Sequence, residues 1–219
     1  MPTLRLREST IISASPQPTV YIVDDDEGVR KSLCRLVETL GVPVKTFDCA
    51  ASFLDAYHGA CPGCLVVDVS MPGMSGLDLQ RELRAQGNEI PVIVLTGYGS
   101  VPAVVEALKQ GATEFLEKPV DNQFLLETIQ RSLALAARRC AEHREHALVR
   151  KRMERLTSRE HEVLGLVVEG LSSKEIGVRL SVSFKTVEAH RANIMRKMEA
   201  ESVAQLVRMV VSAERHADD

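Results

Sequence analysis

Short apolar stretches alternate with helical patterns from Val20 to about Leu135, and this alternation restricts the possible folds more than any other feature of the chain. The apolar stretches are five or six residues long, a length that is typical of buried strands. Alternation of this kind is typical of a doubly wound parallel sheet, in which right-handed crossovers place helices on both faces. We therefore expect an α/β fold with five strands at residues 20–24, 43–47, 64–68, 91–96 and 113–117.

The segments between these strands have apolar residues at helical spacing, with glycines at the points where helices should begin or end. Gly41 follows the first pattern, Gly76 precedes the third and Gly111 follows the fourth. The fourth pattern consists of Val101, Val104, Val105 and Leu108. A fifth helix is expected to begin near Asn122 and to continue into a highly charged segment.

The charged segment and the residues after it define the rest of the domain organisation. Because a helix without a wide apolar face is typically surrounded by solvent, residues 136–153 are expected to form a helical linker. Residues 154–215 hold four short helical patterns. Thr157-Ser158-Arg159-Glu160 matches a capping box with Thr157 or Ser158 as the N-cap, and Ser172-Ser173-Lys174-Glu175 opens the next helix. Residues 1–18 have no sustained period and are expected to be a disordered extension, which leaves 19–135 as the first domain.

The net charge of −3 conceals an uneven distribution along the chain. Residues 150–215 hold 13 Lys and Arg against 9 Asp and Glu, a balance of +4, whereas residues 1–149 are acidic. A contact with nucleic acid is therefore expected in the carboxyl-terminal part. The aromatic content of 4%, with no Trp, argues against a stacking platform for single-stranded nucleic acid.

The five cysteines are an odd number without the spacing of a disulfide framework, which favours a reducing, cytoplasmic compartment. No apolar run indicates a membrane span, and the start of the sequence lacks the pattern of a secretory signal. Cys61-Pro62-Gly63-Cys64 has C-x-x-C spacing. A metal site would need a second Cys/His pair and a redox site would need the dithiol at a helix start, whereas Cys64 begins an expected strand. We therefore interpret this motif as a loop next to a buried small residue.

Polar side chains follow three of the expected strands at the point where each strand ends. Asp24 ends the first strand and Asp25 follows it, Asp68 ends the third strand and Lys118 follows the fifth. The carboxyl ends of parallel strands share one edge of the sheet, where α/β folds place ligand chemistry. Acidic residues at such positions are also common helix N-caps, but that explanation does not account for four groups at one edge.

Mg²⁺, or Mn²⁺ in its place, is the cofactor that suits these oxygen donors. Asp25, Asp68 and the main-chain carbonyl of Ser70 could bind one ion, with Asp24 beside it through water. A carboxylate is also a nucleophile that can form an aspartyl phosphate. The sequence therefore predicts a site for a divalent cation and a phosphoryl group.

Two further groups at this edge suit the charge of a phosphoryl group. Most of the catalysis in phosphoryl transfer is positioning and charge neutralisation. The ammonium of Lys118 could neutralise the phosphoryl oxygens, and the hydroxyl of Thr96, at the end of the fourth strand, could donate a hydrogen bond to one of them.

Residues 20–135 resemble the receiver domain of bacterial two-component response regulators through the motifs IVDDD, LVVDVSMPGMSG, VIVLTGYG and FLEKP. The resemblance implies that Asp68 is the phosphoacceptor and that the two acidic residues at 24 and 25 assist it. It also implies that Thr96 and Phe115 are the hydroxyl and aromatic members of a switch. Lys118 corresponds to the family's lysine, and the bond between Lys118 and Pro119 is expected to be cis.

The expected helix 184–200 has one apolar side, formed by Val187, Ile194 and Met198, and one polar side. On the polar side, alanine methyls could contact thymine methyls and Glu188 could accept from cytosine N4, while flanking cations could bind phosphate. The candidate DNA contacts are Lys174, Lys185, Thr186, Glu188, Ala189, Arg191, Ala192, Arg196 and Lys197. A small helical bundle with a solvated charged face would show the same pattern.

The segment LTSREHEVLGLVVEGLSSKEIGVRLSVSFKTVEAHRANIMRKM resembles the LuxR-type helix-turn-helix. With the receiver, this arrangement resembles the FixJ/NarL family of response regulators, and it is more similar to the FixJ branch. The resemblance implies a transcription regulator that takes phosphate from a sensor histidine kinase, forms a homodimer on phosphorylation, and binds double-stranded promoter DNA and RNA polymerase. The last helix, around Val203, Leu206 and Val210, resembles the one that pairs two DNA-binding modules. No enzyme activity is implied beyond the receiver's own phosphotransfer and dephosphorylation.

Other functions are compatible with parts of the sequence. A Mg²⁺-dependent phosphohydrolase would also use an aspartyl nucleophile, often with a second carboxylate two residues later, where this chain has Ser70. A DNA-binding regulator that does not respond to phosphorylation would bind its operator equally with and without phosphate. A quorum-signal receptor shares the carboxyl-terminal module but needs an enclosed apolar pocket that the acidic first domain does not offer.

Overall fold

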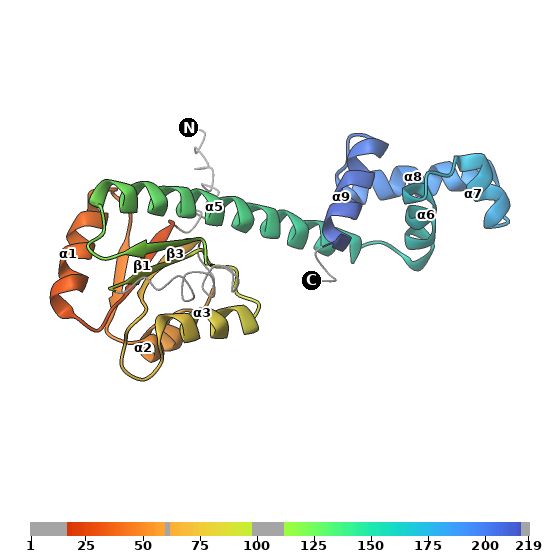
Figure 1. Cartoon of the computed structure of the whole chain (residues 1–219). Coiled ribbons are helices and arrows are strands. Elements are labelled where there is room, and N and C mark those ends of the chain that lie inside the picture. The colour runs from red at the N-terminus through yellow and green to blue at the C-terminus, as the bar shows by residue number, and fades with distance from the viewer. Residues whose placement is uncertain (1–16, 60–61, 98–111, 216–219) are drawn as a thin grey trace, which may run out of the picture. The chain divides into compact units, whose positions relative to one another are not determined.

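The computed structural model describes residues 17–59, 62–97 and 112–215, and the chain divides into two compact units, Met1–Cys140 and Ala141–Asp219. Figure 1 shows a unit of sheet and helices and a unit of helices, and each has its own buried core. The expected helix that ends at Gly111, and most of the expected extension at residues 1–18, lie outside the described residues.

Five parallel strands form the sheet of the first unit, as the alternation predicted. They are β1 (Thr19–Val23), β2 (Val44–Phe47), β3 (Gly63–Asp68), β4 (Val92–Thr96) and β5 (Glu114–Glu117), in the order β2-β1-β3-β4-β5. Each boundary lies within one residue of the predicted one. Because the chain winds first to one side of β1 and then to the other, the edge beside β1 and β3 is the switch point where open α/β sheets bind ligands.

Helices cover both faces of this sheet (Figure 1). They are α1 (Glu27–Glu38), α2 (Ala50–Ala56), α3 (Gly76–Ala85) and the first part of α5 (Asn122–Met153). Because successive strand residues point to opposite faces, Ile22 packs in a cluster with residues of α1 and α5, whereas Val23 packs in a cluster with residues of α2 and α3.

Four helices follow in the second unit, as predicted. They are α6 (Ser158–Val168), α7 (Ser173–Arg179), α8 (Phe184–Met198) and α9 (Val203–Arg215). The capping box expected at the start of α6 is confirmed, with Thr157 and not Ser158 as its N-cap, and α7 also begins with a capping box, at Ser172. Gly170 follows the end of α6 and has a left-handed backbone conformation, with φ +88°. Glycine adopts this conformation at little cost, which makes it the preferred residue just after a helix. None of the described helices is long and apolar enough to cross a lipid bilayer.

Two interpretations of the helical segments need correction. The last turns of α5 are not surrounded by solvent, because His146 and Val149 are buried and Val149 belongs to the core of the second unit. Leu206 and Val210 of α9 lie in the same core, so these two side chains stabilise their own unit and are not available to pair two modules. Val203 remains partly exposed.

Candidate functional sites

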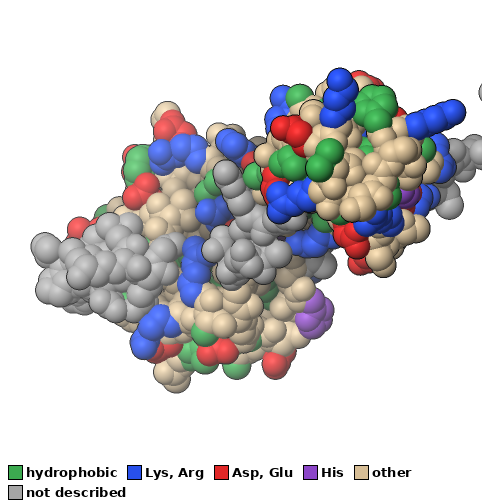
Figure 2. All heavy atoms as spheres, turned by 90° about the vertical axis from the view of Figure 1, so that its right-hand side faces the viewer, with side chains coloured by type: hydrophobic (Ala, Val, Ile, Leu, Met, Phe, Trp, Pro, Cys, Tyr) green, Lys and Arg blue, Asp and Glu red, His purple; other side chains and the backbone are tan. Residues whose placement is uncertain are grey.

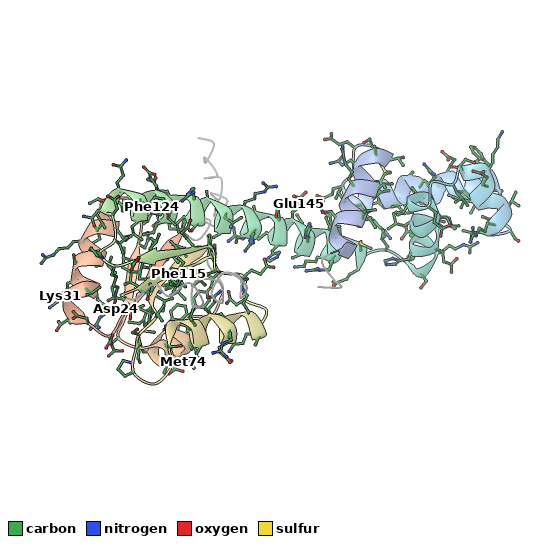
Figure 3. The ribbon with its side chains drawn as sticks, in the orientation of Figure 1. Asp24, Lys31, Met74, Phe115, Phe124 and Glu145 are labelled. Carbon is green, nitrogen blue, oxygen red and sulfur yellow. The ribbon has the colours of Figure 1, made fainter. Side chains whose placement is uncertain are left out.

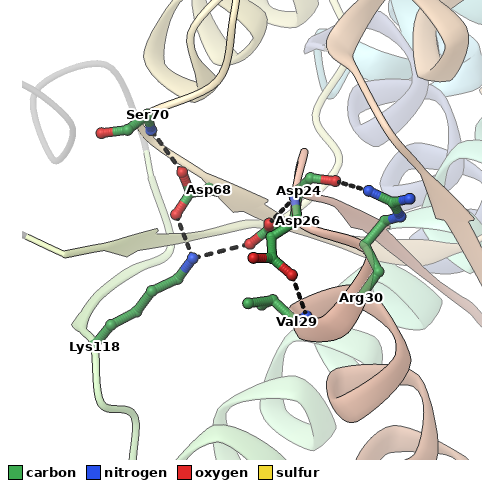
Figure 4. Close-up of polar contacts among 7 residues, drawn as sticks. All are labelled: Asp24, Asp26, Val29, Arg30, Asp68, Ser70 and Lys118. Atoms are coloured by element: carbon green, nitrogen blue, oxygen red, sulfur yellow. Dashed lines mark hydrogen bonds and ion pairs between the residues drawn. The ribbon is translucent and has the colours of Figure 1, made fainter.

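Asp24, Asp68 and Lys118 meet at the carboxyl edge of the sheet (Figure 4). The ammonium Nζ of Lys118 lies 2.5 Å from Oδ1 of Asp68 and 2.9 Å from Oδ2 of Asp24. The two carboxylates are almost completely buried, at 2% and 6% exposed, and the lysine side chain is 28% exposed. A single cation therefore bridges two buried anions from different strands.

Strand register accounts for this meeting. Ile22 pairs with Val66 and Val23 with Val67, so the next residues, Asp24 and Asp68, come to lie opposite each other on neighbouring strands about 4.8 Å apart. Lys118 lies one residue beyond β5, and its main-chain nitrogen donates to the carbonyl of Thr96 at 2.7 Å. The expected cis bond to Pro119 is present.

Main-chain and side-chain donors hold the two carboxylates in place. The nitrogen of Ser70 donates to Oδ2 of Asp68 at 2.7 Å, and the nitrogen of Asp26 donates to Oδ1 of Asp24 at 2.9 Å. Arg30 of α1 donates from Nη1 to the main-chain oxygen of Asp24 at 2.7 Å. Sequence reasoning missed Arg30, although its position one turn inside the helix that follows the acidic residues was a usable signal.

The charge of Lys118 is secured by its surroundings. Burial alone would lower the pKa of Lys118, but the hydrogen bonds to Asp68 and Asp24 outweigh burial and raise this pKa above its usual value. Lys118 is therefore fully protonated at neutral pH and is already fixed beside the carboxylate oxygens of Asp68.

The remaining predicted residues of this site differ in position and exposure. Thr96 is buried at the end of β4, whose residue Leu95 pairs with Asp68. Phe115 pairs with Val94 and packs, half-buried, against the cluster that contains Val94 (Figure 3). Asp25 is exposed next to Asp24. The structure thus brings Asp24, rather than Asp25, into the buried group with Asp68.

The donors at this edge fit a hard divalent cation. Carboxylates and a main-chain carbonyl are the oxygen ligands that Mg²⁺ prefers, and such sites usually use only one or two carboxylates with several waters. Within the described ranges, no three His, Cys, Asp or Glu side chains form a metal-binding cluster. The two buried carboxylates and a main-chain carbonyl are thus the kind of donor set that suits such an ion.

Cys64 is the buried small residue that was expected next to the loop of the C-x-x-C motif. It lies within β3 and is completely buried, and burial raises the pKa of its thiol to about 12. A thiol with so high a pKa is neutral and unreactive at physiological pH. Cys61 lies outside the described residues.

Helix α8 of the second unit has the two predicted faces. Val187, Ile194 and Met198 are buried in the core, as expected. The opposite face is exposed at Lys185, Thr186, Glu188, Ala189, Ala192 and Arg196, while Arg191 is half-buried and Lys174 of α7 is exposed. Figure 2, seen from the α7 side of Figure 1, shows Lys and Arg side chains spread over the surface of this unit.

Two predicted DNA contacts have partners within the unit. Lys197 places Nζ 2.6 Å from Oε2 of Glu160, a carboxylate of α6 that is 4% exposed and also accepts from the nitrogen of Thr157 at 2.7 Å. Glu188 accepts a hydrogen bond from the hydroxyl of Ser173. Sequence reasoning recognised Glu160 as a capping residue and missed its ion pair, because Lys197 is 37 residues away in the sequence.

We expect Glu160→Ala to lower the free energy of unfolding of the second unit by about 2 kcal/mol, because it removes a cap and leaves Lys197 without its anion. The bond to Lys197, the capping hydrogen bond and the other contacts lower the pKa of Glu160 to about 2, below the usual 4.5. Its contribution is therefore complete above pH 4.5 and is lost as the pH falls toward 2. Calorimetry between pH 5 and 3 should show a steeper loss of stability for the wild type than for Glu160→Gln. Glu162→Gln, an exposed residue of the same helix, should keep the wild-type slope.

Comparisons with known proteins assign each unit to a known family. Residues 20–130 match the model of the response regulator receiver domain, and residues 154–210 match that of the bacterial regulatory proteins of the luxR family. The chain is 45% identical to the transcriptional regulatory protein FixJ of Azorhizobium caulinodans, over 89% of this chain and 92% of the relative. It is 40% identical to the response regulator protein TodT of Pseudomonas putida, over 87% and 84%.

Solved structures of whole proteins of this kind are also similar. The response regulator StyR matches with a TM-score of 0.79 and 43% identity, over 89% of this chain and 98% of that one. Full-length FixJ from B. japonicum matches with a TM-score of 0.55 and 37% identity, over 92% and 99%.

Proposed function

Because this chain belongs to the response regulators that join a receiver domain to a LuxR-family DNA-binding domain, we propose that Asp68 is its phosphoryl acceptor. The chain is a phosphorylation-dependent transcription regulator of a two-component system. The observation that carries the assignment is the contact of Lys118 with Oδ1 of Asp68, which joins a nucleophile and a fixed cation at the switch point of the sheet.

The transfer begins with attack of a carboxylate oxygen of Asp68 on the phosphorus of a phosphohistidine in a sensor kinase. The new P–O bond forms as the P–N bond breaks, and the histidine, which carries a proton on its other ring nitrogen, leaves as a neutral imidazole. Lys118 lies where it can neutralise the phosphoryl oxygens, and the main-chain nitrogen of Ser70 fixes the second carboxylate oxygen. This is the receiver's own phosphotransfer; no turnover on an external substrate is proposed.

Asp24, Asp68 and the carbonyl of Ser70 are the groups that would hold Mg²⁺ or Mn²⁺, with Asp25 available beside them through water. When bound, the ion supplies positive charge that offsets the charge of the phosphoryl group. Arg30 fixes the main-chain oxygen of Asp24 and thereby keeps the acidic segment in position.

Phosphorylation of Asp68 would be transmitted along one face of the sheet. Thr96 is two residues after Val94 in β4, and Val94 pairs with Phe115, so alternation gives these residues a common face. A hydroxyl drawn toward the phosphoryl group would leave space for Phe115 to repack. The change would shift a pre-existing equilibrium toward the form that dimerises and binds promoter DNA, where RNA polymerase is the expected further partner.

In the second unit, we assign base and phosphate contacts to the exposed face of α8 and to the cations that flank it. The proposed contacts are Lys174, Lys185, Thr186, Glu188, Ala189, Arg191, Ala192 and Arg196. Lys197 already binds Glu160, so its proposed part is to fix α8 against α6 and leave the phosphate contacts to the other cations.

Chemical mapping of the acyl phosphate tests the assignment. The full chain is incubated with acetyl phosphate and Mg²⁺ and then treated with borohydride, which reduces an acyl phosphate to an alcohol. Fragmentation of the peptides should place homoserine at position 68. Asp68→Asn should give no homoserine at any position, whereas the exposed Asp48→Asn should give the wild-type result. Homoserine at another aspartate, or steady release of phosphate from small phosphomonoesters, would contradict the assignment.

A further inference from the structure

Ser173 and Glu188 connect the two helices of the helix-turn-helix through their side chains. Ser173 is the first residue of α7 and is 9% exposed, and its hydroxyl donates to Oε1 of Glu188 on the exposed face of α8. The N-cap of α7 is the preceding residue, Ser172, whose side chain accepts from the nitrogen of Glu175. The hydroxyl of Ser173 is thus not required for capping and is directed to Glu188.

Glu188 has a restricted choice of partners in a DNA groove. It lies one helical turn before Ala192, on the face assigned to base contacts. A carboxylate has acceptors and no donor, so among base edges in the major groove it can pair only with an exocyclic amino group, cytosine N4 or adenine N6. The oxygen acceptors of guanine and thymine repel it.

The hydrogen bond from Ser173 determines how large a free-energy penalty Glu188 imposes on a wrong base pair. A free glutamate on a helix surface has many rotamers and can turn into solvent when it meets an unfavourable base. A carboxylate held by a charge-assisted hydrogen bond stays where it is. A wrong base pair then faces a fixed negative group, and discrimination comes from a penalty on wrong sites as well as from a contact to the right one.

We propose that Ser173 is a positioning residue for base recognition, which holds Glu188 where it accepts a base amino group and rejects a base without one. The inference rests on the proposed role of α8 in DNA binding. It has a specific consequence for Ser173→Ala. The variant should lose preference at one base pair mainly because it binds the wrong bases more tightly, while its affinity for the preferred site changes little.

The test uses the full chain, treated with Mg²⁺ and beryllofluoride as a phosphoryl analogue, because the phosphorylated form is the one expected to bind DNA. Binding sites are selected from randomised double-stranded DNA, and fluorescence anisotropy then measures affinity for the preferred site and its single-base-pair variants. We expect the wild type to prefer an amino-bearing base by about 10-fold at one position. Ser173→Ala should reduce this ratio to about 3-fold, and Glu188→Ala should abolish it. The double variant should equal Glu188→Ala.

Two neighbouring residues supply matched controls. Ser172→Ala removes the cap of the same helix and should lower its stability without a change in base preference. Lys174→Ala should weaken binding equally for all sequences and make the salt dependence shallower by about one unit of slope. Ser173→Ala should match the wild type in its salt dependence.

The outcomes separate the inference from the function on which it rests. Glu188→Ala should remove the base preference at one base pair of the site. If Ser173→Ala keeps the wild-type ratio of affinities at that base pair, the inference is wrong and the base contact of Glu188 stands. Equal loss of preference at every position, as from a less stable domain, would also overturn it. If the wild type selects no sequence, or if Glu188→Ala changes no base preference, the proposed role of α8 or of Glu188 fails, and the inference fails with it.

Discussion

Gly76→Ala is expected to lower the free energy of unfolding of the receiver by about 3 kcal/mol, the upper end of the usual cost of overpacking. Gly76 begins α3 directly behind Asp68, and a Cβ atom added there would lie 2.3 Å from the main-chain oxygen of Asp68 and 3.0 Å from its carbonyl carbon. Those atoms belong to β3 and cannot rotate away as a flexible side chain could. The helix gain from alanine, about 1 kcal/mol, does not compensate.

Tyrosine fluorescence during urea unfolding measures this loss, because all three Tyr of the chain lie in residues 1–140 and the chain has no Trp. Formation of the acyl phosphate from acetyl phosphate should fall as well, since a displaced carbonyl of Asp68 moves its carboxylate away from Lys118. Gly97→Ala is the matched control, because no atom of the residues that the structure describes lies within 4 Å of its added Cβ. A Gly76→Ala receiver with the wild-type unfolding midpoint would show that α3 can move away from β3 at no cost.

The fold was predictable from the sequence because its determinants are local. Buried parallel strands are nearly continuous apolar runs, and each of these runs became a strand within one residue of its expected ends. The capping box of α6 was predictable for the same reason, since cap and partner are three residues apart, although the structure was needed to choose Thr157 over Ser158 as the cap. Convergence of Asp68 and Lys118 followed from the topology, because all strands of a parallel sheet end at one edge.

The choice between Asp24 and Asp25 needed strand alternation as well as strand ends. Ile22 and Val66 pack on the same face of the sheet, and Asp24 and Asp68 continue the same alternation two residues later. Asp24 therefore enters the buried group while Asp25 turns outward. This signal was present in the sequence, but only the register of β1 against β3 made it decisive.

Contacts between side chains far apart in the sequence could not be predicted. The pairs formed by Lys197 with Glu160 and by Ser173 with Glu188 depend on how α8 crosses α6 and α7, and no local period specifies that crossing. The end of α5 was misjudged for a related reason. His146 and Val149 are two buried residues in the charged part of α5. A buried face this narrow cannot be recognised from sequence periodicity before the surface that covers it is known.

Lys118→Met is expected to lower the free energy of unfolding of the receiver by about 3 kcal/mol at neutral pH without divalent cations, because removal of one partner leaves buried charges uncompensated. The carboxylates of Asp24 and Asp68 would then face each other without the ammonium that now lies between them. The loss should have a defined pH dependence. Since the folded-state pKa of Lys118 is raised, its contribution is complete below the usual lysine pKa of 10.5 and disappears as the pH rises through the folded-state value. The variant should therefore lack the alkaline decline of the wild type.

Mg²⁺ should reverse much of the damage in Lys118→Met, and this reversal distinguishes an electrostatic defect from a simple loss of packing. A cation that binds only the folded state stabilises it, and the gain increases with the logarithm of the ratio of cation concentration to dissociation constant. At the proposed site, Mg²⁺ would share the carboxylates with the ammonium in the wild type, whereas in Lys118→Met it would meet two bare anions. About 10 mM Mg²⁺ should therefore raise the urea midpoint of Lys118→Met more than that of the wild type. Lys31→Met, which removes an exposed cation paired with Glu27, should lose less than about 0.5 kcal/mol and show the wild-type response. Equal Mg²⁺ responses in Lys118→Met and the wild type would mean that Lys118 does not offset the charge of the carboxylates that bind the cation.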